Sequence, residues 1–367
     1  MKNRYLIRWA IVWTLLTSLA IGVVAQQSRH ALTEVYKNPD FQLTGITVSK
    51  TGRLFVNFPR WSAEYLNAVV EVKSDGTVKP YPDEYWNRWD MKVANAGKQF
   101  VCVQSVVADD SGNLWVLDPA APMLITPVLG GAKLVKIDLH TNKVTNVVHF
   151  GLDIAKDGSY LNDVRVDTRR NFAYITESGT GGIVVVDLAS GMAHRALDGN
   201  PSVLAEPGVV IKPDGKPVLA PNGKPFAGNS DGIALSNDGN YLYYQALAGA
   251  TLYRVRTNIL RDPNARPDAV AAAVEKVAKT FPADGLWMSS KGTLYLSNLN
   301  ANAVSRLLPS GGTEIVASDP RLQWPDTLSE GPDGSIYISA SHINESPTFN
   351  HGKSVRKLPY GVFKFTP

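Results

Sequence analysis

The chain has 367 residues, of which 44% are hydrophobic and 19% charged, a composition that excludes a disordered, collagenous or coiled-coil protein. Three of its 37 basic residues lie among the first 25 residues, so the rest of the chain is nearly neutral and has no basic surplus for nucleic acid or an anionic membrane. The single cysteine, Cys102, excludes a disulfide framework and a Cys-rich metal site.

The first 25 residues have the pattern of a secretory signal peptide. Lys2, Arg4 and Arg8 precede an apolar run over residues 9–24, and small residues then permit cleavage after Ala25. The apolar run is also near the shortest length that spans a bilayer, so an uncleaved N-terminal anchor is the alternative. We expect residues 1–25 to be a signal peptide and the mature protein to be secreted or periplasmic, without membrane association after cleavage.

One pattern recurs six times along the remaining chain. An alternating apolar strand is followed by a polar turn, usually with glycine, and by a second strand with an aromatic residue near its middle, which predicts a β-hairpin. The six copies occupy residues 45–56, 105–116, 163–175, 232–244, 285–296 and 327–338. The turns lie about 40 to 70 residues apart, and a unit of this size has room for the four strands of a propeller blade.

Further apolar segments follow several of the hairpins. Residues 133–138, 183–188 and 251–255 have the pattern of third strands. The fold class is therefore predicted to be all-β, a six-bladed β-propeller that forms one domain over residues 26–367.

Two inserts interrupt the repeat. Residues 201–228 contain two proline-started turns and are expected to form a small extra hairpin. Residues 268–279 are alanine-rich with valines at helical spacing and are expected to form a short helix capped by Asp268.

The order of several short motifs resembles the major royal jelly protein/yellow family, from about residue 40 to the C-terminus. The matching stretches are NFPRW at 57–61, LWVLD at 114–118, YLND at 160–163, YITES at 174–178, GIVVVD at 182–187, DGIALS at 231–236, LYRVRT at 252–257 and SNL at 297–299.

This resemblance implies a secreted six-bladed propeller. Members of the family convert dopachrome-type compounds, bind biogenic amines in the central channel, or serve as food and structural proteins. The chain departs from many insect members because it cannot form their disulfides. More distantly, it resembles gluconolactonase- and regucalcin-like propellers, which hold a metal ion in the channel.

The residues that precede each inner strand of a propeller converge on one mouth of the central channel, where ligands commonly bind. Here these positions are rich in carboxylates, which repel one another unless a cation or protonation balances them. The positions are Thr44, Gln104, Ser105, Asn162, Asp163, Ser230, Asp231, Asp284 and Asp326. Asp-Gly before a strand is also ordinary turn chemistry, so a structural role stays open for Asp231 and Asp284.

Our leading hypothesis is an exported propeller that binds a small polar or aromatic molecule at the channel mouth. Asn162, Asp163, Asp231 and Asp284 are the expected ligand-binding anchors, and Arg60 and Trp61 are expected to form one wall or to pack between blades. Whether the protein is an enzyme stays open. In a tautomerase of the yellow type, Asp163 and Asp231 would be the catalytic residues that shuttle a proton.

Two alternatives belong to other classes. In a metal-dependent lactonase, Asn162, Asp231 and Asp284 would hold calcium or another divalent ion, whereas the leading hypothesis needs no cofactor. In a non-catalytic scaffold, the blade edges would bind protein partners, which the sequence leaves unknown. Glu177 and Asp118 end second strands at equivalent places in adjacent blades and are expected to bond the backbone of the neighbouring blade rather than to catalyse.

Overall fold

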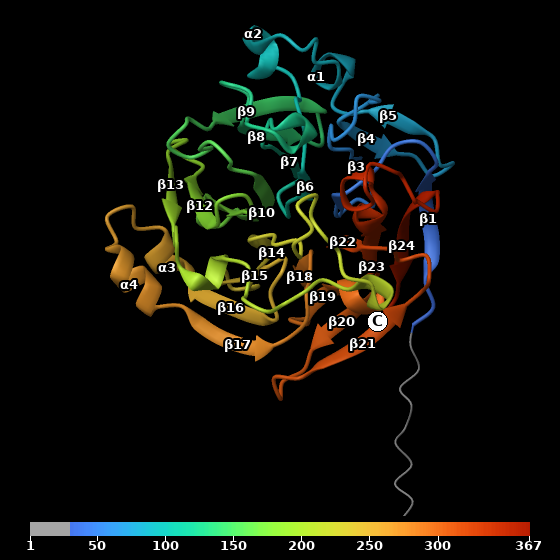
Figure 1. Cartoon of the computed structure of the whole chain (residues 1–367). Coiled ribbons are helices and arrows are strands. Elements are labelled where there is room, and N and C mark those ends of the chain that lie inside the picture. Colours follow the sequence, from blue (N-terminus) through green and yellow to red (C-terminus); the bar gives the residue numbers. More distant parts are fainter. Residues whose placement is uncertain (1–29) are drawn as a thin grey trace, which may run out of the picture.

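The computed structural model describes residues 30–367, which form six four-stranded antiparallel sheets arranged around a central axis (Figure 1). The six-bladed β-propeller predicted from the repeat is thereby confirmed. The predicted signal peptide, residues 1–25, lies outside the described residues. Within residues 30–367, no helix is long and apolar enough to cross a membrane.

Blades one to three follow the chain order, with the first strand of each blade innermost. Blade one is formed by β2 (Ile46–Val48), β3 (Leu54–Asn57), β4 (Val69–Val72) and β5 (Val78–Pro80). Blade two is formed by β6 (Ser105–Ala108), β7 (Asn113–Asp118), β8 (Lys133–Asp138) and β9 (Lys143–His149). Blade three is formed by β10 (Leu161–Asp167), β11 (Phe172–Glu177), β12 (Gly182–Asp187) and β13 (Ala193–Ala196).

Blades four and five have the same order. Blade four is formed by β14 (Ser230–Leu235), β15 (Tyr241–Ala246), β16 (Thr251–Arg256) and β17 (Glu275–Lys279). Blade five is formed by β18 (Leu286–Met288), β19 (Leu294–Asn298), β20 (Ala303–Leu307) and β21 (Thr313–Ser318). All six predicted hairpins correspond to the two inner strands of a blade, and the predicted third strands correspond to β8, β12 and β16.

Blade six combines the two ends of the described chain and so closes the ring. It is formed by β22 (Pro325–Glu330), β23 (Ile336–Ala340), β24 (Tyr360–Phe365) and, as its outer strand, β1 (Thr33–Asn38). The register places Thr33 opposite Lys364 and Asn38 opposite Tyr360, with a bulge between Glu34 and Tyr36. Hydrogen bonds between the first and last strands therefore hold the propeller shut.

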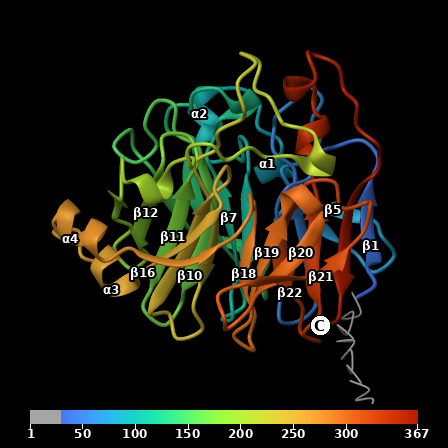
Figure 2. The same cartoon turned by 60° about the horizontal axis from the view of Figure 1, so that its bottom comes forward.

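The longest loops gather on one face of the propeller, which is uppermost in Figure 2. This face carries the two short helices α1 (Glu84–Asn87) and α2 (Val93–Ala96), the insert at 201–228, and the loop between β23 and β24. Loops that enter an inner strand and loops that join the second and third strands end on the same face, because the strands of each blade are antiparallel. The channel mouth lies on this face.

The two predicted inserts differ from expectation. The predicted helix over 268–279 is wrong in its second half: α4 (Pro267–Ala272) ends early, and β17 follows as the outer strand of blade four. A fourth strand completes the sheet, and pairing with β16 outweighs the helical spacing of the valines. Residues 201–228 contain the short 3₁₀ helices η2 (Pro201–Val203) and η3 (Pro213–Gly215), and only the bridge between Leu219 and Pro225 resembles a hairpin.

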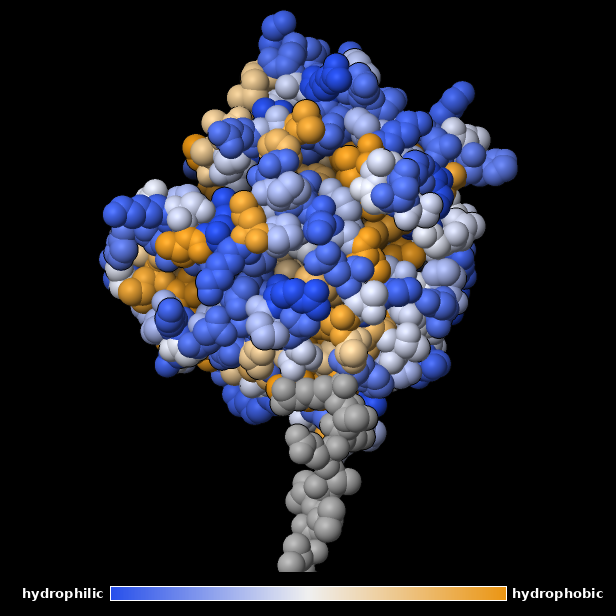
Figure 3. Space-filling view, turned by 90° about the vertical axis from the view of Figure 1, so that its right-hand side faces the viewer, coloured by the Kyte–Doolittle hydropathy of each residue, from blue (hydrophilic) through white to orange (hydrophobic). Residues whose placement is uncertain are grey.

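Apolar side chains pack between neighbouring blades. The largest cluster joins blades two and three and includes Trp115, Leu117, Val164 and Ile175. The outer surface is different: Figure 3 shows the side of the molecule that is on the right in Figure 1, where hydrophilic residues dominate and hydrophobic ones are scattered between them. The blades are therefore held together by burial of apolar area at their contacts.

If β1 closes the ring, truncating its one buried side chain should lower the stability of the whole fold. Tyr36 is 7% exposed and packs in the cluster of Leu43, Ile46 and Val56. We predict that Tyr36→Ala lowers the free energy of unfolding by about 3 kcal/mol in urea denaturation. Lys37→Ala, on the exposed side of the same strand, is the matched control, and equal effects of the two substitutions would contradict this role of β1.

Candidate functional site

Four aspartates meet at the channel mouth, as the sequence predicts. Asp163, Asp231 and Asp326 lie near the start of the inner strands β10, β14 and β22, and Asp284 lies two residues before β18. All four are buried, with 3–6% of their surface exposed. The ends of four neighbouring blades thus bring four carboxyl groups into one small region beneath the loops.

Two glycines allow this convergence. A Cβ atom on Gly232 would lie 2.5 Å from the backbone oxygen of Asp284, and one on Gly285 would lie 2.2 Å from that of Asp326. Contacts this short are forbidden, so only glycine lets the inner strands of blades four, five and six approach so closely. The Asp-Gly pairs therefore serve close packing around the channel, and not the turn chemistry that the sequence left open for them.

A directed chain of hydrogen bonds joins residues of blades one to four and ends on Asp231. Trp61 donates its indole N–H to the hydroxyl of Tyr160 at 2.9 Å, and Tyr160 donates to Oε1 of Gln104 at 2.8 Å. Gln104 donates through Nε2 to Oδ1 of Asn162 at 3.1 Å, and Asn162 donates through Nδ2 to Oδ2 of Asp231 at 2.7 Å. Every donor in the chain is directed toward this carboxylate.

Asp284 receives a matching bond from the other side of the mouth. The fully buried Trp324, in the loop before β22, donates its indole N–H to Oδ2 of Asp284 at 2.6 Å. Asp231 and Asp284 are also close enough for each to shift the pKa of the other. Two carboxylates at that separation cannot both be ionised at low energy, so the pair is expected to share one proton.

Burial is the main cause of unusual pKa values at the mouth. It raises the pKa values of Asp231, Asp284 and Asp326 well above their ordinary range, and the neighbouring carboxylates raise them further. The pKa of Asp163 is raised less, because Arg165 and the Ser105 hydroxyl beside it favour the ionised form. At a pH at which an ordinary aspartate is ionised, these buried carboxyl groups therefore favour the protonated form.

Arg165 is the cation that faces this cluster. It follows Asp163 by two residues on β10, is 6% exposed, and donates to the backbone oxygens of Val164 and Leu286, both at 2.7 Å. Its guanidinium carbon lies 5.4 Å from the ring centre of Trp287. The sequence analysis missed Arg165, although the two-residue period of a strand places it on the same face as Asp163.

The two predicted wall residues have different roles. Trp61 joins the hydrogen-bond chain, whereas Arg60 packs away from the carboxylates: its guanidinium lies 4.0 Å from the ring centre of Tyr65 and 5.6 Å from that of Trp89. Arg60 also donates to the sulfur of Met91 at 3.3 Å. Arg60 therefore packs against the aromatic side chains of the loops beside the mouth.

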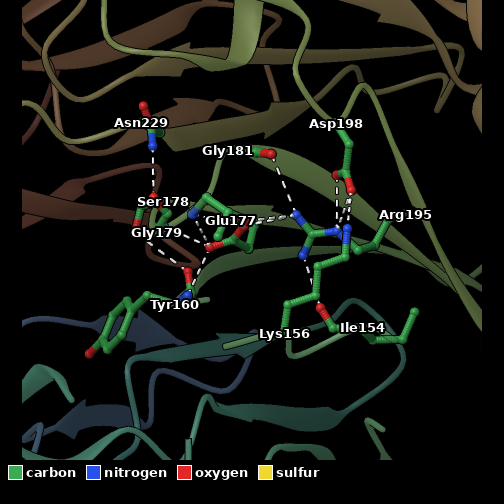
Figure 4. Close-up of polar contacts among 11 residues, drawn as sticks. Ile154, Lys156, Tyr160, Glu177, Ser178, Gly179, Gly181, Arg195, Asp198 and Asn229 are labelled. Carbon is green, nitrogen blue, oxygen red and sulfur yellow. Dashed lines mark hydrogen bonds and ion pairs between the residues drawn. The ribbon is translucent and has the colours of Figure 1, made fainter. Parts of the chain in front are cut away.

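Glu177 holds the loop that carries Tyr160 (Figure 4). Its Oε1 accepts the backbone N–H groups of Tyr160 and Gly179 at 2.8 and 2.7 Å, and its Oε2 accepts from Arg195 at 2.9 Å. Arg195 in turn bonds both carboxylate oxygens of Asp198. These contacts are those of a structural carboxylate, as predicted, but the backbone groups belong to blade three itself and not to the neighbouring blade.

Asp118 has the equivalent place in blade two. It accepts the backbone N–H groups of Val101 and Cys102 at 2.7 and 3.0 Å and pairs with Lys133 at 2.7 Å. Both partners of this ion pair are fully buried. The pair fixes the segment that leads into Gln104, and so positions one link of the hydrogen-bond chain.

The proposed metal ligands are brought together, but they bond to one another. Asn162 directs its amide N–H to Asp231, and Asp284 accepts from Trp324. Over residues 30–367, no group of three or more His, Cys, Asp or Glu side chains has an arrangement that could hold a metal ion.

Comparison with known proteins gives a family and a fold. A family model described as "Major royal jelly protein" matches residues 101–345, which is more than half of the chain. Major royal jelly protein 1 of Apis mellifera is 26% identical over 318 residues, which cover 79% of this chain and 70% of that protein. Major royal jelly protein 3 of the same species is 24% identical over 249 residues, covering 65% of this chain and 43% of the relative.

Solved structures confirm the fold at low sequence identity. A calcium-binding protein, regucalcin, from Agrobacterium tumefaciens has a TM-score of 0.56 at 15% identity, covering 92% of this chain and 93% of that one. A gluconolactonase from Xanthomonas campestris has a TM-score of 0.56 at 12% identity, covering 92% and 89%. At such identities the likeness concerns the propeller architecture alone.

The buried pair of Asp118 and Lys133 provides a test of the scaffold. Asp118→Ala leaves a buried ammonium group without its counter-ion, and we predict a loss of about 4 kcal/mol in the free energy of unfolding. The matched control is Asp110→Ala, which breaks an exposed Asp–Lys pair with Lys50 and should change stability by less than about 1 kcal/mol. Similar losses in both variants would contradict the account.

The raised pKa values predict how stability depends on pH. Above the ordinary value of 3.8, the unfolded chain releases its aspartate protons while the folded mouth keeps them, so these groups destabilise the fold increasingly as pH rises toward their folded pKa values. In Asp284→Asn one such group is gone. We predict that its stability relative to the wild type rises by at least about 1 kcal/mol between pH 5 and pH 8, measured by urea denaturation. A pH-independent difference would contradict the raised pKa.

Proposed function

The chain belongs to the major royal jelly protein family, and from that premise we propose that it is an exported propeller that binds a small aromatic amine at the channel mouth. The ammonium group of the ligand would lie among the carboxylates of Asp231, Asp284 and Asp326. The family resemblance implies the same ligand class.

The observation that carries this proposal is the excess of buried carboxyl groups. Four aspartates face one guanidinium at the mouth, and Oδ1 of Asp231 and Oδ2 of Asp326 are buried without an N–H or hydroxyl donor in residues 30–367. An ammonium group offers three donors and one positive charge. It would supply both the missing hydrogen bonds and the missing charge.

Aromatic side chains beside the carboxylates favour a planar ligand. Trp61 and Tyr160 are partly buried and lie at the end of the chain that leads to Asp231, and Trp287 lies on the inner strand of blade five. Aromatic faces also attract organic cations. An indole or phenyl ring attached to the amine would therefore have surfaces to pack against.

A catalytic form of the same function is a tautomerase. In such a reaction a carboxylate accepts a proton from one atom of a quinone-like substrate, and a proton is returned to another atom, so no oxidant or reductant is needed. Asp163 and Asp231 would carry the proton, since one is flanked by a cation and the other is expected to share a proton with Asp284. Their raised pKa values let these carboxyl groups hold a proton at a higher pH than an ordinary aspartate does.

The proposal is tested by calorimetric titration with tryptamine. We predict that Asp231→Asn and Asp284→Asn each weaken binding at least about tenfold, because each replaces a carboxyl group that can ionise beside the ammonium group by a neutral amide. Asp110→Asn, at an exposed position, should bind as the wild type does. Catechol, which lacks the amine, should bind more weakly than tryptamine.

Two outcomes would overturn the amine proposal. Binding that is unchanged in both mouth variants would place the amine elsewhere, and absence of binding would remove the ligand class. Metal analysis of the dialysed protein tests the lactonase alternative. That alternative predicts about one divalent ion per chain, and it predicts that Asp231→Asn loses both the ion and the hydrolysis of sugar lactones. Such a result would replace the amine in our proposal by a metal ion held by Asn162, Asp231 and Asp284.

A further inference from the structure

A cavity lies apart from the channel aspartates, between blades five and six. It has a volume of about 680 Å³ and is lined by residues of β1, β24, the loop before β22 and η4 (Leu299–Ala301), in the region of β20, β21 and β24 in Figure 1. The insert after blade three reaches it through Asp214. This volume is in the range of sites for small molecules.

Two buried side chains of the residues that line this cavity have hydrogen-bond acceptors without a donor in residues 30–367. Asn302 is 6% exposed; its Nδ2 donates to Asp214 at 2.7 Å, but its Oδ1 is buried without a partner. His342 is 3% exposed, and its Nδ1 lies 2.8 Å from Oε2 of Glu345. Because a carboxylate only accepts, Nδ1 donates, and Nε2 of a neutral ring is left as an acceptor. Burial lowers the pKa of His342, which favours the neutral ring.

The residues around these groups have a backbone conformation that is unfavourable for most residues other than glycine. Asp214, Asn302 and His342 all have left-handed backbone conformations, with φ of 51°, 47° and 52°. Such strain in residues other than glycine often accompanies binding sites, where the surrounding structure fixes a side chain in place. The left-handed conformations and the acceptors without a partner therefore both favour a binding role for this cavity.

Most of the charged side chains in the lining are already paired. Arg321 bonds Asp319 at 2.8 Å and lies 3.9 Å from Glu34, and Asp214 accepts from Asn302 and from Gln323. Lys357 is exposed and forms no ion pair within residues 30–367. A ligand that pairs with Arg321, Asp319 or Asp214 would have to compete with these contacts. A neutral ligand that donates several hydroxyl protons would satisfy the free acceptors without disturbing them.

We propose that this cavity is a binding site for a neutral polyhydroxylated molecule of the carbohydrate class, with Asn302 and His342 accepting its hydroxyl protons. Phe363, Pro320 and Pro359 add apolar lining against which the C–H faces of a sugar can pack. The site does not depend on the channel ligand.

The test is saturation-transfer NMR and NMR titration of the full mature protein with glucose and maltose. Asn302→Gly removes the amide oxygen, and His342→Asn replaces the ring and its Nε2 acceptor by a shorter amide. Both new residues tolerate the left-handed backbone, and we expect each substitution to weaken sugar binding at least about tenfold. Matched controls are Asn171→Gly and His351→Asn, which have the same backbone conformation, with φ of 57° and 53°, at exposed positions.

The controls, and Asp231→Asn at the channel mouth, should bind sugar as the wild type does. Absence of saturation transfer from the wild-type protein to either sugar would overturn the proposal. Wild-type affinity in Asn302→Gly and His342→Asn would overturn it as well, provided that thermal unfolding shows all variants to be folded.

Discussion

The constraint on which the site depends is that four buried carboxyl groups share one channel mouth with a single guanidinium. Two bonds relieve this repulsion from opposite sides: Asn162 donates to Asp231, and Trp324 donates to Asp284. The two bonds favour a negative charge on the pair, whereas burial raises the pKa values and favours a retained proton. The closed ring of blades keeps the carboxyl groups from moving apart, and the arrangement suits the cation that we propose as the ligand.

The scaffold explains how this arrangement persists. Each blade supplies one end of an inner strand, so small displacements of one blade would separate partners that lie on different blades. Buried ion pairs outside the mouth, Asp118 with Lys133 and Glu177 with Arg195, fix the segments that carry Gln104 and Tyr160. The outer strand β1 closes the ring, and Gly232 and Gly285 permit the close approach of the inner strands.

The sequence predicts this architecture because the repeat is local. Each hairpin has its own alternation and turn, and the aspartates recur at one position of the repeat, so their convergence follows from the fold class. Contacts made by single residues across blades were not predictable in this way. Trp324 reaches Asp284 from a loop with a left-handed backbone, φ 53°, and nothing in the local sequence indicates that contact. Over residues 268–279 the valines have helical spacing, but residues 275–279 instead form the fourth strand of blade four.

The most direct measurement of the central claim is the number of protons released when the amine binds. Calorimetric titration with tryptamine in two buffers of different ionisation enthalpy measures this number. A cation beside the pair of Asp231 and Asp284 lowers their pKa values, so binding at mildly acidic pH should release protons, and Asp284→Asn should release fewer. Binding without proton release, or with proton uptake, would contradict a shared proton at the mouth.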